Sequence, residues 1–216
     1  MHENSAKVSG RNLEGCAHCG PVTYTVASGL IGAHTSINMP EFNFFHDADM
    51  KLIGYGPPIS SEQIKSILKC DFPGRDKFDE FYIQHNGGHF PEPAFFYRDT
   101  FYPTSSSEWN KMYVEGFYFI PLFPGQKNRR LSSSVSVREQ REKYSTFVSY
   151  RSMIRDFIEN HFPFSYDAAD NDFWIELKSG RVRYVAWDSS ETVQDVCDMA
   201  PSFYDFTSNI WLKPRD

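Results

Sequence analysis

The sequence predicts an α+β fold in which a mixed or antiparallel sheet packs against several helices, preceded by an N-terminal extension. Two patterns lead to this prediction. Apolar residues recur at helical spacing in residues 60–85, and later in the chain aromatic-rich runs show strand character. The 216 residues suffice for one sizeable core, and 20 Phe and 12 Tyr predict that aromatic rings supply most of the buried area.

We expect two parts in the chain, an extension formed by residues 1–51 and a domain formed by residues 52–216. The extension carries Gly and Ser throughout and shows no helical period. Residues 22–26 alternate and could form one strand. Two interpretations stay open: a loosely structured segment packed on the domain, or a β-hairpin added to the edge of its sheet.

The first expected helix follows a glycine- and proline-rich boundary at residues 54–58. Ser60 can cap the backbone amide of Gln63, and the Gln63 side chain can reciprocate, which makes a capping box. The buried face of this helix is then made by Ile64, Ile67 and Leu68. The Asp-Phe-Pro-Gly sequence at residues 71–74 breaks the helix and leads into a helical hairpin.

The second expected helix has a buried stripe made by Phe78, Phe81, Tyr82 and His85. Asn86, Gly87 and Gly88 follow directly, and these residue types adopt the left-handed conformation at little cost. We therefore interpret them as the C-terminal stop of the helix. Pro91 and Pro93 keep the helix from resuming, so the chain is expected to continue in an extended conformation.

Strands are predicted after residue 88, where the spacing of apolar residues changes from a period near four to a period of two. The predicted strands are residues 94–97, 112–122, 173–177 and 182–187. Ser179 and Gly180 lie between the last two runs and favour a two-residue hairpin turn. This arrangement predicts that at least the last two strands are antiparallel neighbours.

Two more helices are expected in the second half of the chain. The first has a stripe that starts near residue 145 and consists of Phe147, Tyr150, Ile154, Phe157 and Ile158. Pro163 is expected to end this helix. Pro201 and Ser202 can start a final helix that closes the core with Phe203, Phe206 and Ile210.

The net charge of −6 and the pI near 5.6 argue against a nucleic-acid partner, because nucleic-acid binders neutralise phosphates with excess basic residues. Residues 127–155 are locally basic, but their aromatic residues fit the helical stripe rather than an exposed face. The sequence contains no run of about 20 apolar residues, so we expect no membrane span. The N-terminus lacks a secretory pattern, so we expect a cytoplasmic protein whose four cysteines are thiols.

The pair Cys16 and Cys19 could hold half of a tetrahedral zinc site, with His18 between them. A second such pair is missing, so we predict no metal at this motif, while zinc and redox roles stay open as alternatives. His85 and His89 are four residues apart, but the helix is expected to end between them. Sequence motifs for phosphate binding or hydrolysis are also absent, so we expect neither an enzyme nor a cofactor.

An acidic loop precedes the predicted hairpin and is the candidate binding region. Asp167, Asp170 and Asp172 are spaced like calcium ligands, but the loop lacks the glycine and the glutamate that a calcium loop needs at its sixth and twelfth positions. The carboxylates could instead belong to a solvated turn or to a contact surface for a basic protein.

The contact-surface interpretation extends from this loop to the far end of the hairpin. Its partner-binding candidates are Asp167, Asp170, Asp172, Trp187, Asp188 and Glu191. Asp195 and Asp198 could lie near the same end. Trp174 and Tyr184 are further aromatic anchor candidates, although strand alternation requires that at least one of these rings points inward. If the partner is a nuclease, such carboxylates could occupy its basic cleft as phosphate mimics.

The order of these pieces resembles the SMI1/KNR4, or SUKH, superfamily. The resemblance rests on residues 58–88, 162–184 and 202–210, and together these frame roughly residues 52–216. Asn86-Gly87-Gly88 in its helical context is the most specific element. The chain departs from the family pattern in having Ala-Ala-Asp-Asn at residues 168–171, where members usually carry glycines, and in a long insertion near residues 127–143.

The resemblance implies an α+β fold without catalytic residues. Bacterial members look largely like immunity proteins that neutralise toxins, many of them nucleases, delivered by contact-dependent inhibition or by secretion systems such as type VI. It therefore implies a cognate toxin domain, basic if it is a nuclease, as the partner. The alternatives are a regulatory scaffold of the same fold and a zinc protein built on Cys16 and Cys19.

Overall fold

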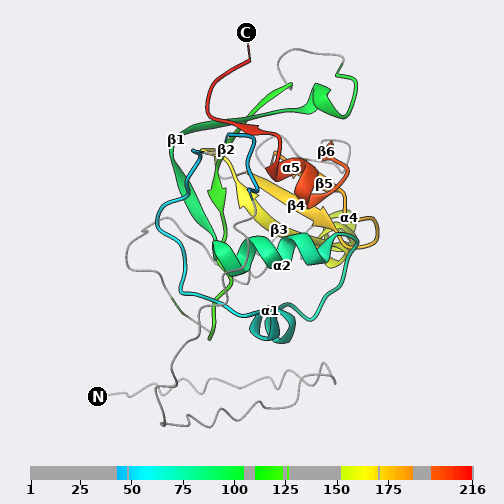
Figure 1. Cartoon of the computed structure of the whole chain (residues 1–216). Coiled ribbons are helices and arrows are strands. Elements are labelled where there is room, and N and C mark those ends of the chain that lie inside the picture. Colours follow the sequence, from blue (N-terminus) through cyan, green and yellow to red (C-terminus); the bar gives the residue numbers. More distant parts are fainter. Residues whose placement is uncertain are drawn as a thin grey trace, which may run out of the picture. The chain divides into compact units, whose positions relative to one another are not determined.

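A curled antiparallel sheet, with strands in the order β6-β5-β4-β3-β2-β1-β7, forms the centre of the computed structural model (Figure 1). The structure describes residues 43–47, 49–104, 110–123, 126, 152–169, 171–186 and 196–215, without the side chains of residues 152–155. The residues of the predicted N-terminal hairpin lie outside this described part. The predicted α+β class with an antiparallel sheet is confirmed.

The first six strands follow one another as neighbours in chain order, and the seventh returns to the free side of the first. Every pair of neighbouring strands is antiparallel. The strands are β1 (Gly88–Tyr97), β2 (Lys111–Phe117), β3 (His161–Tyr166), β4 (Asp172–Glu176), β5 (Val182–Val185), β6 (Val196–Ala200) and β7 (Ile210–Trp211).

Within the described ranges, helices lie on both faces of this sheet. They are α1 (Ser61–Leu68), α2 (Arg75–Gln84), the 3-10 turn η1 (Arg98–Thr100), α4 (Ser152–Asn160) and α5 (Phe203–Thr207). The predicted capping box opens α1: Ser60 Oγ accepts from Gln63 N at 3.3 Å, and Gln63 Oε1 accepts from Ser60 N at 2.8 Å. The predicted helical hairpin formed by α1 and α2 is thus confirmed.

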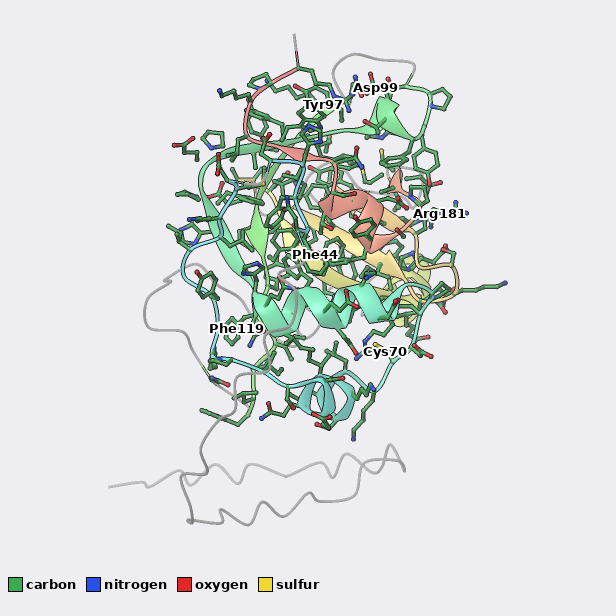
Figure 2. The ribbon with its side chains drawn as sticks, viewed as in Figure 1. Phe44, Cys70, Tyr97, Asp99, Phe119 and Arg181 are labelled. Atoms are coloured by element: carbon green, nitrogen blue, oxygen red, sulfur yellow. The ribbon has the colours of Figure 1, made fainter. Side chains whose placement is uncertain are left out.

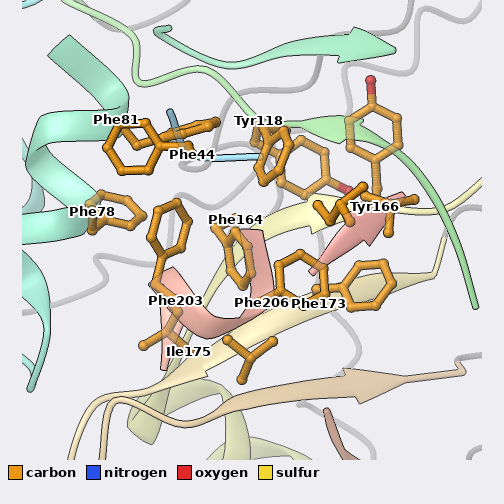
Figure 3. Close-up of a cluster of buried hydrophobic side chains, with 14 of the residues drawn as sticks. Phe44, Phe78, Phe81, Tyr118, Phe164, Tyr166, Phe173, Ile175, Phe203 and Phe206 are labelled. Atoms are coloured by element: carbon orange, nitrogen blue, oxygen red, sulfur yellow. The ribbon is translucent and has the colours of Figure 1, made fainter. Parts of the chain in front are cut away.

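One face of the sheet carries the main core, in which aromatic rings are abundant (Figure 3). Phe78 and Phe81 of α2 meet Phe203 of α5 edge to face, with ring centroids 5.1 and 5.3 Å apart. Phe206 of α5 stacks on the sheet residue Phe96 at 4.8 Å. The core also includes Phe44, Phe45 and Met50, which precede the expected domain start at residue 52.

The opposite face of the sheet carries a small second cluster under α4. It consists of Phe157, Ile158, Trp174 and Val185. Strand alternation explains the division. Asp172 and Trp174 of β4 lie on the face of the second cluster, opposite their β5 partners Val185 and Arg183. Phe173 and Ile175 alternate with them and point into the main core.

The sheet curls far enough for its two halves to touch. η1 directly follows β1, yet it lies against β6 near the other edge of the sheet. There Arg98 Nε donates to the Asp198 carbonyl at 3.3 Å. α5 packs inside the curl, against both α2 and β6.

The predicted end of the third helix is wrong. α4 ends at Asn160, and Pro163 lies within β3 instead of terminating the helix. All six residues of β3 are buried, so the strand lacks the alternation that reveals a half-buried strand in a sequence. The missing N–H of Pro163 is tolerated beside a register shift between Pro163 and Ser165.

The chain between residues 193 and 212 also differs from the prediction. Ser202 caps α5 as expected, but the helix ends at Thr207, and Ile210 belongs to β7. Residues 196–200 form β6, which was not predicted. The hairpin between β4 and β5 is confirmed, with a longer turn in which Glu176 N donates to Arg181 O at 2.9 Å.

Candidate functional site

The Asn86-Gly87-Gly88 element stops α2 as predicted, by a different geometry. The cap residue His85 is extended, with φ −136, and the left-handed region is reached only at Gly87 (φ 74) and Gly88 (φ 118). Asn86 is buried and acts as a clamp on two other segments. Its Nδ2 donates to Pro57 O at 2.8 Å and to Ile120 O at 3.0 Å, while its Oδ1 accepts from Ile120 N at 2.8 Å.

The acidic loop does not present all of its carboxylates to solvent. Asp167 is 8 % exposed and Asp172 is fully buried. The anchor candidates Trp174 and Tyr184 are buried as well. The other partner-binding candidates, Asp170, Trp187, Asp188 and Glu191, lie outside the described residues, as does Asp195. Asp167 and Asp172, two of the partner-binding candidates, are therefore buried in the folded chain.

Asp167 holds the loop between β3 and β4 closed. Its Oδ1 accepts from the backbone amides of Ala169 and Asn171 at 2.8 and 3.0 Å. Its Oδ2 accepts from the Tyr184 hydroxyl at 2.7 Å and from Asn171 Nδ2 at 3.1 Å. Burial, followed by this bond to Asp167, raises the pKa of Tyr184. The Asp167 carboxylate thus has a structural role, and its hydrogen-bond partners satisfy both of its buried oxygens.

Asp172 is held in the same way by a second tyrosine. The Tyr118 hydroxyl donates to Asp172 Oδ1 at 2.5 Å, and the Tyr118 ring stacks on Tyr166 at 4.9 Å. The two aspartates at the ends of this loop are therefore both paired with buried tyrosines, one from β5 and one from the segment after β2.

Replacing Tyr118 with phenylalanine is expected to lower the free energy of unfolding by about 1.5–3 kcal/mol, the range for a hydrogen bond to a charged group. The ring and its packing are kept, so the loss reports on the bond to Asp172. Urea unfolding followed by circular dichroism measures it. Tyr113→Phe removes a hydroxyl from a 53 % exposed side chain and should change the free energy by less than about 0.5 kcal/mol. Equal losses in both variants would contradict this role.

The strand register places the loop between β3 and β4 beside the residues that flank the segment from 187 to 195. Asp172 pairs with Val185, and Val185 pairs with Val196. The loop between β3 and β4 and the two ends of the segment from residue 186 to residue 196 are therefore neighbours. Asp188 and Glu191 of that segment lie outside the described residues, so the proximity of the two acidic segments stays a prediction.

Asp198 offers no free carboxylate for a basic partner. Its Oδ2 lies 3.0 Å from Arg181 Nη1 and its Oδ1 lies 3.0 Å from Arg183 Nε. Arg183 also lies 3.8 Å from Glu176 Oε1. Alternation along β5 and β6 could have suggested the pairing of Arg183 with Asp198, but β6 was not predicted as a strand.

His161 is the first residue of β3. Its side chain packs against α4 and is kept neutral. Its ring stacks on Phe157 at 3.8 Å, and its Nδ1 is 2.7 Å from the Phe157 carbonyl, to which it donates as the neutral tautomer. Its Nε2 is buried without a hydrogen-bond partner. Burial lowers the pKa of His161 to about 4, although the hydrogen bond to the Phe157 carbonyl opposes this shift.

This environment predicts a stability loss in acid. The unfolded chain binds a proton on this histidine near pH 6.5, whereas the folded protein resists protonation down to about pH 4. The His161 contribution is therefore complete above pH 6.5 and falls by about 1.4 kcal/mol per pH unit below it, down to the folded-state pKa. Urea unfolding of wild type and His161→Gln across this range should show a smaller slope in the variant. The same slope in both proteins would contradict the assignment.

Other predicted sites are placed only in part. Cys16, His18 and Cys19 lie outside the described residues. Within the described ranges, no group of three His, Cys, Asp or Glu side chains could hold a metal. His85 packs against Tyr55 and Phe45, and His89 lies in a strand beyond the end of the helix. Among the helices that the structure describes, none has the length and apolar character needed to cross a membrane.

Comparison with known proteins returns no relative: no protein-family model, no curated protein and no solved structure matches this chain. Its function is therefore inferred from the fold and from individual residues. Sequence reasoning missed the two buried aspartate–tyrosine pairs because a spaced acidic loop gives no sign of which carboxylates turn inward.

Proposed function

We propose that this chain is an immunity protein of the SMI1/KNR4, or SUKH, type that binds a cognate bacterial toxin domain and neutralises it by direct contact. In this proposal the protein is cytoplasmic and has no catalytic role. The toxin domain is a nuclease or another enzyme whose active site the bound protein blocks or locks.

The Asn86-Gly87-Gly88 clamp carries this proposal, because it was the most specific element of the resemblance. A capped helix, a Pro-Gly break and a second helix lead into it, as the resemblance implies. The structure gives a physical reason for the residue type at each position of the element. The Asn86 side chain hydrogen-bonds to two other segments, and Gly87 and Gly88 adopt a positive φ. The antiparallel hairpin and the closing helix α5, with Phe203 and Phe206 buried, further support the proposal.

Affinity capture of the tagged full chain from its native cells tests this function. We expect one stoichiometric partner that stays bound through a salt wash, is encoded beside this gene and carries a toxin-like C-terminal domain. Many substoichiometric proteins would favour the regulatory scaffold instead. Zinc measured in the purified protein would favour the alternative based on Cys16 and Cys19.

A further inference from the structure

An aromatic row crosses three strands on the sheet face opposite the main core. Trp211 of β7, Phe95 of β1 and Tyr113 of β2 are direct cross-strand neighbours, so their side chains share this face. The rings of Phe95 and Tyr113 are 5.2 Å apart. Tyr113 is 53 % exposed, whereas the Trp211 ring is partly buried and stacks on His46 with ring centroids 3.4 Å apart, so the row is open to solvent at the Tyr113 end.

Two cations lie over these rings. The Lys111 ammonium is 4.5 Å from the centroid of Phe95 and 5.7 Å from that of Tyr113. The Arg215 guanidinium lies over Tyr97 at 4.7 Å and over Trp211 at 5.2 Å. We call these six residues the cation–aromatic face: Phe95, Tyr97, Lys111, Tyr113, Trp211 and Arg215.

The charges of this face are incompletely neutralised. Arg215 pairs with Asp99 at 3.3 Å, and Figure 2 shows Tyr97 and Asp99 close together at this end of the molecule. Lys111 is partly buried and makes no ion pair with a carboxylate among the described residues. A partly dehydrated ammonium beside aromatic rings gains more from a carboxylate than a fully solvated one does.

We propose that the cation–aromatic face is the contact surface for the toxin domain, and that the toxin places a carboxylate on Lys111 and an apolar side chain against Tyr113. This inference rests on the proposed function and names its binding surface. Tyr, Trp and Arg are the residue types that dominate binding energy at interfaces, and on this face Tyr113 and Arg215 are exposed while Trp211 is partly buried. At the acidic end of the sheet, by contrast, the carboxylates of Asp167, Asp172 and Asp198 already have partners.

The test measures the Kd of the captured and purified toxin domain for single variants of the full chain. Tyr113→Ala and Lys111→Glu should each weaken binding at least ten-fold. The matched controls are Tyr55→Ala, at a 49 % exposed tyrosine beside His85, and Lys178→Glu, at an exposed lysine in the β4–β5 turn. Both controls should bind within two-fold of wild type. Tyr113→Phe, which keeps the ring, should also bind like wild type.

The outcomes separate the two claims. A toxin that binds Tyr113→Ala and Lys111→Glu as tightly as wild type would overturn this surface and leave the immunity function intact. The same result, combined with weaker binding to Asp170→Lys or Asp188→Lys, would place the contact at the acidic end instead. If wild type binds no toxin, the proposed function fails, and this inference fails with it. Thermal unfolding of each variant confirms that a lost affinity is not a lost fold.

Discussion

Gly87→Ala is expected to lower the free energy of unfolding by about 4 kcal/mol or more. So large a loss points to one specific cause, a steric clash of the added Cβ with the backbone of Phe119. A Cβ at this position would lie 2.6 Å from Phe119 N and 2.7 Å from Phe119 Cα. Both atoms belong to the backbone, so no side-chain rotation can relieve the overlap. The positive φ of 74 adds about 1–2 kcal/mol for any residue with a Cβ. Domains are stable by only roughly 5–15 kcal/mol, so much of the variant should be unfolded or insoluble.

Gly74→Ala is the matched control for this prediction. Gly74 also has a positive φ, of 83, but a Cβ there would meet no atom within 4 Å. It therefore reports the conformational penalty alone, about 1–2 kcal/mol. Urea unfolding of the two variants isolates the contribution of the close approach to Phe119. A Gly87→Ala variant no less stable than Gly74→Ala would show that the tight turn is not required.

Asn86→Ala is expected to lower the free energy of unfolding by about 3–5 kcal/mol, since buried groups left without partners each cost roughly 1–3 kcal/mol. The side chain satisfies the amide and carbonyl of Ile120 and the carbonyl of Pro57, and it is only 3 % exposed. The variant leaves the amide and carbonyl of Ile120 buried without this partner, leaves the Pro57 carbonyl partly buried, and also creates a small cavity. Equilibrium unfolding in urea, with an unchanged slope against denaturant, measures the loss.

Asn110→Ala provides the comparison for Asn86. Asn110 makes a similar double contact, accepting from Asp99 N at 2.9 Å and donating to Asp99 Oδ2 at 2.8 Å, but both bonds are exposed. Water replaces such bonds, so a loss below about 1 kcal/mol is expected. Losses of similar size in the two variants would contradict the view that burial makes Asn86 a clamp.

The helical hairpin could be predicted because its signals are local. Ser60 and Gln63 are three residues apart and bond to each other, and the stripe containing Phe78 and Phe81 is read within two turns. The stop after α2 was predicted for the same reason. What the sequence could not show is that Asn86 reaches Ile120, because that contact depends on how the two segments pack.

The strands were predicted less well because their signals are not local. β3 is buried on both faces and contains Pro163, so it shows neither alternation nor a proline-free run. β7 is two residues long and exists only through its pairing with Phe95 and Phe96 of β1. Tertiary pairing, which one sequence does not reveal, decides such short strands.

The candidate surfaces show the same limit. The acidic loop was found by composition, but composition does not show that Tyr184 and Tyr118 turn two of its carboxylates inward. The cation–aromatic face was missed because Trp211, Phe95 and Tyr113 are distant in the chain and become neighbours only through the sheet register. A charge count of the whole chain, −6, also conceals a local cationic surface.

The measurement that tests the central claim most directly is growth protection. The toxin domain captured with this chain is expressed in a bacterial host under an inducible promoter, with and without the full-length wild-type protein. We predict that the toxin alone arrests growth, and that co-expression restores it. Tyr113→Ala, which should weaken binding, is expected to restore growth only in part. Continued growth arrest in the presence of folded, equally abundant wild-type protein would contradict the account.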